Sequence, residues 1–114
     1  MKSYDIVESI TDEATHQMPD LRELPDRKEF LKNLCEDLDV LMDLTEAETF
    51  SAGIDERTMD ILLTLSCPEI LAREENHPLS QILVNAKSFA VRKSPDMEDG
   101  IELQFRLPGI WASR

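Results

Sequence analysis

Glycine and aromatic residues are scarce in this chain of 114 residues, which has three glycines, one tryptophan and 5% aromatic residues in all. Sandwiches and barrels need many tight turns, so this composition disfavours an all-β fold. Hydrophobic residues make up 41% of the chain, which is enough for a core and too many for a disordered acidic tail. We expect a single domain spanning residues 1–114.

Cysteines and long apolar runs are also few. The two thiols, Cys35 and Cys67, do not make a disulfide framework, so we expect a reduced, cytoplasmic protein. The longest aliphatic runs are triplets such as Ile61-Leu62-Leu63, and the first residues lack the apolar stretch of a signal peptide. The sequence therefore predicts no membrane span.

Basic residues are outnumbered by acidic ones, 12 to 24, which gives a formal net charge of −12. Such a surface repels nucleic acid phosphates and anionic membranes and attracts basic partners. The charge is also uneven, because residues 1–60 hold 17 acids and 6 bases while residues 61–114 hold 7 acids and 6 bases. This asymmetry indicates one acidic end or face, and it argues against direct binding of nucleic acid.

Apolar residues repeat at helical spacing along most of the chain. The strongest repeat places Phe30, Leu34, Leu38 and Leu41 on one stripe, which predicts a central helix over residues 26–44. Further helices are predicted over residues 4–17, 55–66, 68–75 and 78–90.

The last quarter of the chain changes its period. Apolar and polar residues alternate over residues 101–107, with Gly100 as a turn residue before them, and residues 89–93 form a second short run. These runs predict a C-terminal β-hairpin that packs on helices, because an isolated hairpin is only marginally stable. The predicted fold class is α+β, mainly α: a compact bundle of four to five helices with a C-terminal β-hairpin.

No motif for catalysis or metal binding is complete. Asp37-x-Asp39 begins like a calcium loop but lacks its glycine and its closing glutamate. His16 and His77 have no neighbour at metal-ligand spacing, so we expect neither a metal nor another cofactor. Cys67 precedes a proline at a predicted helix start, where a thiol pKa could fall, but a buried, unreactive cysteine is the simpler interpretation. We expect no enzyme.

The segment around Gly53 loosely fits a helix-turn-helix over Thr45–Leu62. Thr49 stands where the close helix packing of that motif favours alanine or glycine. The second helix would begin Asp55-Glu56-Arg57-Thr58-Met59-Asp60, in which three of six residues are acidic. This is the wrong charge for a DNA-reading helix, so an ordinary pair of helices is the better interpretation.

Acidic residues cluster on and after the central helix. Glu36, Asp39 and Asp43 share one helical face over about 10 Å, and Glu46 and Glu48 follow. Phosphates recur every ~3.4 Å along a strand of duplex, so three such carboxylates could occupy alternate phosphate positions in a basic groove. Taken alone, a charge run of this kind is usually a solvated polar face. The five residues are nevertheless the partner-binding site that we predict.

In size and charge, but in no motif, the chain resembles phage- or plasmid-borne inhibitors of nucleic-acid enzymes, including anti-restriction and anti-CRISPR proteins. The predicted function is therefore a non-enzymatic interaction protein that binds a basic site on a partner protein, and can inhibit it, as a nucleic-acid mimic does. The alternative is a regulatory or assembly subunit that associates through an apolar patch, with itself as a homodimer or with a larger protein. The C-terminal Trp111 could serve as an anchor or fold back on the core. An enzyme that uses Cys67 ranks third.

Overall fold

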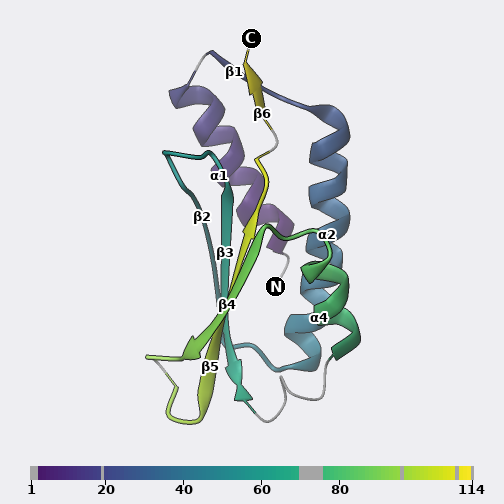
Figure 1. Ribbon diagram of the computed structural model, residues 1–114, viewed down its shortest axis with the longest axis vertical. Helices are drawn as coiled ribbons and strands as arrows, with labels where there is room; N and C mark the ends of the chain where they lie inside the picture. Colours follow the sequence, from purple (N-terminus) through teal and green to yellow (C-terminus); the bar gives the residue numbers. More distant parts are fainter. Residues whose placement is uncertain (1–2, 19, 70–75, 96, 110, 114) are drawn as a thin grey trace.

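The computed structural model describes residues 3–18, 20–69, 76–95, 97–109 and 111–113 (Figure 1), with the backbone alone described at residues 21–23, 25, 27, 76–78 and 111–113. The elements, in chain order, are α1 (Ser3–Gln17), β1 (Leu21–Glu23), α2 (Pro25–Leu44), β2 (Thr49–Ile54), β3 (Ile61–Pro68), α4 (Asn76–Leu83), β4 (Ser88–Lys93), β5 (Gly100–Leu107) and β6 (Trp111–Ser113). The described residues extend over 45 × 25 × 23 Å.

Four strands form an antiparallel sheet in the order β2-β3-β5-β4. Two hairpins, β2–β3 and β4–β5, are joined by the pairing of β3 with β5, which runs from Ile61 opposite Leu107 to Pro68 opposite Gly100. Strands β2 and β4 are therefore the edges of this sheet. A separate two-stranded sheet pairs β1 with β6, with Leu21 opposite Ser113.

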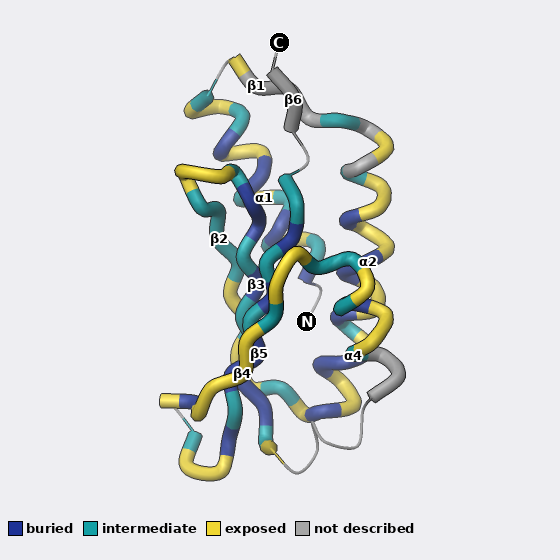
Figure 2. Tube along the Cα trace, viewed as in Figure 1, coloured by how far each residue is buried: buried dark blue, intermediate teal, exposed yellow. Residues whose placement is uncertain are grey.

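The two faces of the main sheet differ because side chains alternate along each strand. Ile61, Leu63 and Leu65 of β3 are buried on the face toward the helices, and Leu103 and Phe105 of β5 are buried beside them. Figure 2 shows the buried positions gathered between the strands and the inner sides of α1 and α2. The opposite face carries no described helix, and we call it the open face.

The helices form where one apolar stripe meets this sheet. Helix α2 begins with Pro25 in its first turn and buries Leu34, Leu38 and Leu41, all three at most 3% exposed. Its last turn is closed by Thr45, whose hydroxyl donates to the Leu41 carbonyl at 2.7 Å. The prediction of a central helix is confirmed.

The predicted helical bundle is wrong. Among the described residues there are three helices and a four-stranded antiparallel sheet, so the fold is a small α+β fold. Residues 55–66, predicted as a helix, form the β2–β3 turn and most of β3. The hydrogen bonds that β3 makes to strands on both sides override its helical spacing of leucines.

The remaining predicted elements have mixed outcomes. A helix over 68–75 falls mostly outside the described residues, and its first residue, Pro68, ends β3. The helix predicted over residues 78–90 is too long at its C-terminal end. In the structure α4 ends at Leu83, and β4 begins at Ser88. The predicted C-terminal hairpin is confirmed as β4–β5, and it is half of the sheet rather than an appendage.

Candidate interaction site

The predicted partner-binding carboxylates lie at two places. Glu36 and Asp39 line a groove between α1 and α2, whereas Glu46 and Glu48 lie exposed in the connection between α2 and β2. Asp43 is exposed near the end of α2 and does not line the groove. The structure therefore brings two of the five residues together, and the other three extend the acidic surface toward β2.

The groove between α1 and α2 has a volume of about 370 Å³ and is lined by Tyr4, Asp5, Lys32, Glu36 and Asp39. Helix α1 is held at this point by two hydrogen bonds. The backbone N–H of Ser3 donates to Asp39 Oδ1 at 2.8 Å, and the Ser3 hydroxyl donates to the Cys35 carbonyl at 3.1 Å. Asp39 therefore also helps to hold α1 in place. We call the groove with these five lining residues the α1–α2 groove.

Two carboxylates in the α1–α2 groove are exposed enough to meet a partner. Asp5 and Glu36 are exposed, and they approach the groove from different helices. Tyr4 supplies the aromatic wall, and burial together with a hydrogen bond to Glu8 raises the pKa of its hydroxyl. Carboxylates beside an aromatic ring match a guanidinium or an ammonium group. Lys32 lies in the same groove and would have to give way to such a cation.

A second exposed feature of α2 is apolar. Phe30, Val40 and Leu44 are 44%, 50% and 46% exposed, and their spacing of ten and four residues places them along one stripe beside the acidic face. The outer side of α2 appears as a run of exposed positions in Figure 2. Phe30, which the sequence predicts in the core stripe, thus lies outside it. This helix offers both surfaces that the two predicted functions require.

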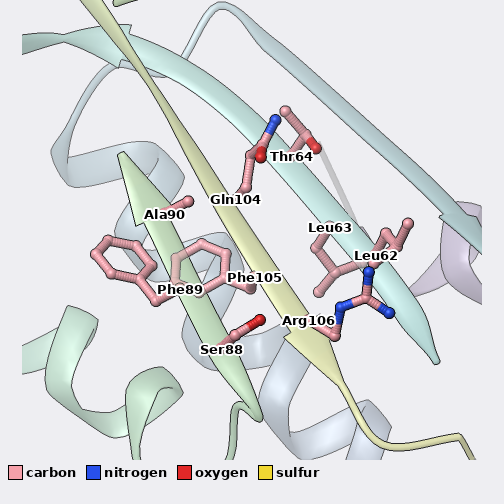
Figure 3. Close-up of a pocket in the computed structure, with 9 residues that line it drawn as sticks. All are labelled: Leu62, Leu63, Thr64, Ser88, Phe89, Ala90, Gln104, Phe105 and Arg106. Carbon is pink, nitrogen blue, oxygen red and sulfur yellow. The ribbon is translucent and has the colours of Figure 1, made fainter. Parts of the chain in front are cut away.

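The open face of the sheet holds a shallow hollow of about 330 Å³ (Figure 3). Its outward side chains, two from each of three strands, are Leu62 and Thr64 of β3, Ser88 and Ala90 of β4, and Gln104 and Arg106 of β5. Figure 3 shows the side chains of Thr64 and Gln104, which are register partners on neighbouring strands, side by side, and the Arg106 guanidinium beside Leu62. None of the described residues that line the hollow is a carboxylate, histidine or cysteine, so the hollow holds no acid–base pair.

A charge cluster fixes one end of this open face. Arg106 Nη1 lies 3.0 Å from Asp55 Oδ2 and 3.1 Å from Asp60 Oδ2, and Lys87 Nζ lies 3.1 Å from the same Asp60 oxygen. Burial opposes the ionisation of Asp60, which is 3% exposed, but the hydrogen bonds from Lys87 and Arg106 outweigh it and lower its pKa. Sequence reasoning missed this cluster, because its members lie up to 51 residues apart.

Both cysteines are buried in the core and form no disulfide. Burial raises the pKa of the Cys35 thiol to about 11 and raises that of Cys67 as well. Cys67 lies within β3, and its burial there is the largest cause of its raised pKa. The interpretation of Cys67 as a reactive thiol loses its physical basis. His77, the nearest histidine in sequence that could act as its base, has a side chain outside the described residues.

Other sequence motifs also resolve into ordinary structure. Gly53 lies inside β2 opposite Leu62, so the helix-turn-helix alternative is excluded. His16 is exposed in the last turn of α1, and Trp111 lies in β6, where only its backbone is described. Among the residues with described side chains, no three His, Cys, Asp or Glu side chains gather to hold a metal ion. No described helix has the length and hydropathy to cross a membrane.

Comparison of the chain with protein-family models, with curated proteins and with solved structures finds no match.

Proposed function

We propose that this chain is a non-enzymatic interaction protein that binds a basic surface of a partner protein through the carboxylates of α1 and α2. The observation that carries the proposal is the α1–α2 groove, where Asp5 and Glu36 converge from two helices beside the ring of Tyr4. A cation that enters this groove meets carboxylates from two directions. The net charge of −12 steers basic partners toward it.

The acidic surface continues past the groove along α2. Asp43 is about 10 Å from Glu36 along the helix, and Glu46 and Glu48 extend the surface toward the sheet. A partner with several arginines in a row, such as the phosphate-binding groove of a nucleic-acid enzyme, matches this spacing. Occupying such a groove would block its nucleic acid, so the proposal includes inhibition by nucleic-acid mimicry.

The alternative function rests on the exposed apolar stripe of α2. Phe30, Val40 and Leu44 could pair with a second copy or with an apolar partner surface, which would make the chain an assembly subunit. The two functions differ in their response to salt, because salt screens ion pairs and leaves apolar association intact.

The test is the affinity for a fluorescent nona-arginine peptide, measured from about 20 to about 500 mM NaCl. The test variant combines Asp5→Lys, Glu36→Lys and Asp43→Lys, and it spares Asp39 because that carboxylate accepts the Ser3 N–H. Its matched control combines Asp20→Lys, Glu98→Lys and Asp99→Lys. These three residues are exposed and lie outside α1 and α2. The control also replaces three acids by lysine, so it changes the net charge equally.

We expect the parent to bind the peptide with an affinity that falls steeply with salt. The test variant should lose most of this affinity, whereas the control should keep most of it. The reason is that the carboxylates of α1 and α2 bind the peptide, and the net charge alone does not. Equal weakening of both variants would contradict a localised site. A flat salt response, together with concentration-dependent dimerisation that Leu44→Asp abolishes, would support the assembly function instead.

A further inference from the structure

A second concave site lies between α1 and the turn that joins β2 to β3. Its apolar walls come from Ile10, Ala14 and Met18 on one side and from Ile54 and Met59 on the other. The volume is about 180 Å³, which fits one aliphatic side chain. We call it the methionine slot.

The slot exists because α1 buries only part of its apolar surface. Val7 and Thr11 face the core, whereas Ile10, one position from Thr11, is turned partly outward. Helix α1 contacts β2, so the space beside Ile10 is bounded by the end of that strand rather than filled by it. An unfilled apolar space forfeits dispersion contacts on one side, and a fitting side chain would restore them.

The turn wall of the slot is held in a defined shape. Met59 has a φ of 60°, a left-handed conformation that is unfavourable for a non-glycine residue. The conformation is held by hydrogen bonds from the Met59 N–H to the Asp55 carbonyl at 2.6 Å and from the Asp55 N–H to the Asp60 carbonyl at 3.0 Å. Arg106 ties Asp55 and Asp60 to β5, so this wall is organised before any partner arrives.

The charges around the slot are acidic on both walls. Glu13 of α1 and Glu56 of the turn are exposed at the slot, and none of the described side chains that line it is basic. Glu13 accepts a weak hydrogen bond from Gln17 at 3.4 Å, which leaves its second oxygen for a partner. Arg57 follows Glu56 in the turn and does not line the slot.

From this combination we infer that the methionine slot is a docking site for a basic segment of a partner protein, which inserts one aliphatic side chain between Met18 and Met59 while flanking arginines or lysines pair with Glu13 and Glu56. Methionine walls adapt their shape to such a side chain. The inference rests on the proposed function only in taking the partner to be basic. It adds a second, apolar point of recognition on the other side of α1.

The test uses two synthetic heptapeptides, each with two arginines on both sides of an Ala-X-Ala centre, where X is leucine in one and serine in the other. We expect the leucine peptide to bind about tenfold tighter, because burying a leucine side chain in an apolar site supplies a free energy of that order. In protein labelled with ¹³C at its methionine methyl groups, the leucine peptide should shift the Met18 and Met59 resonances. Met42, which is buried in the core, is the internal control.

Two variants make the inference falsifiable. Met59→Gly removes the side chain and also relieves the left-handed strain, so it should fold normally and lose the tenfold preference for leucine. Glu13→Gln with Glu56→Gln should weaken both peptides, and the control Glu98→Gln with Asp99→Asn should not. The inference would be refuted if the parent bound the two peptides with equal affinity, or if the leucine peptide shifted neither the Met18 nor the Met59 methyl resonance.

The same peptides separate this inference from the proposed function. If the lysine variant of the α1–α2 groove weakens both peptides and keeps the leucine preference, both sites act. If that variant does not change the affinity for either peptide while the leucine preference persists, the proposed function of the groove is refuted and the inference about the slot is supported. If arginine peptides bind to the groove with no leucine preference, the slot fails alone.

Discussion

Replacement of Leu38 by alanine is the sharpest test of the core. Leu38 is 0% exposed and lies in the middle of α2, within the cluster that joins this helix to β3 and β5. Removing three carbon atoms there leaves a cavity that neither the sheet nor the helix can close without losing register. Buried leucine-to-alanine changes cost 2–5 kcal/mol, and we expect about 3 kcal/mol for this position.

That loss is a large share of the 5–15 kcal/mol that stabilises a typical domain. At roughly 4 °C per kcal/mol for a chain of this size, the melting temperature should fall by about 12 °C. The assay is thermal unfolding followed by circular dichroism, supported by a urea titration that should show a lower midpoint and an unchanged slope. The matched control is Val40→Ala in the same helix. Val40 is 50% exposed, so its replacement should shift stability by no more than about 0.5 kcal/mol. Equal melting temperatures for the two variants would refute the placement of α2 against the sheet.

Three further predictions follow from particular contacts. Cys35 and Cys67 should react with a thiol reagent at neutral pH only when the chain unfolds, since burial raises both thiol pKa values. Rapid labelling of the native chain would contradict their burial. Folding lowers the pKa of Asp60, so its ion pairs should stabilise the fold above the ordinary aspartate pKa of 3.8 and lose that contribution as the pH falls below it. In Asp60→Asn, the free energy of unfolding should therefore depend less on pH in the acidic range. Gly100→Ala should lower the free energy of unfolding by about 1–3 kcal/mol, because the new Cβ would lie 2.5 Å from a Met97 side-chain atom. Gly53→Ala is the control, because its new Cβ would have no atom within 4 Å, and a urea titration should show no change in stability.

The sequence predicts α2 well because its apolar positions form a single stripe. Leu34, Leu38 and Leu41 recur at helical spacing, polar residues fill the other positions, and Pro25 marks the start. Local pattern and tertiary burial agree here, which is the condition under which periodicity is a reliable guide.

The first hairpin was not predicted for two different reasons. In β2, Phe50, Ala52 and Ile54 alternate with polar or small residues, but Gly53 suggests the turn between two helices rather than a strand residue opposite Leu62. In β3, Leu62 lies on the open face next to leucines of the core face, so apolar residues occupy both sides of the strand. Such a run fits a helix as well as a strand, and only pairing with β2 and β5 decides between them.

The candidate sites were partly predictable. Glu36 and Asp43, which lie off the leucine stripe, are exposed, whereas Asp39 is partly buried and accepts the Ser3 N–H. That these carboxylates and Glu46 and Glu48 bind a partner stays a prediction. The α1–α2 groove and the methionine slot arise where α1 packs against distant parts of the chain. No local pattern contains that information.

The strand order has a consequence for the route by which the chain folds. Strand β5 is the partner of both β3 and β4. It begins at Gly100, 39 residues after the start of β3 at Ile61, so it is synthesised well after β3. During synthesis, the first two helices and the β2–β3 hairpin emerge with one leucine-rich edge of β3 unpaired. An unpaired apolar edge is a template for aggregation, and pairing across such a separation is slow. We therefore expect the nascent chain to depend on chaperones until β5 leaves the ribosome, and a weakened β3–β5 pairing to show itself first as insoluble protein rather than as a lower melting temperature.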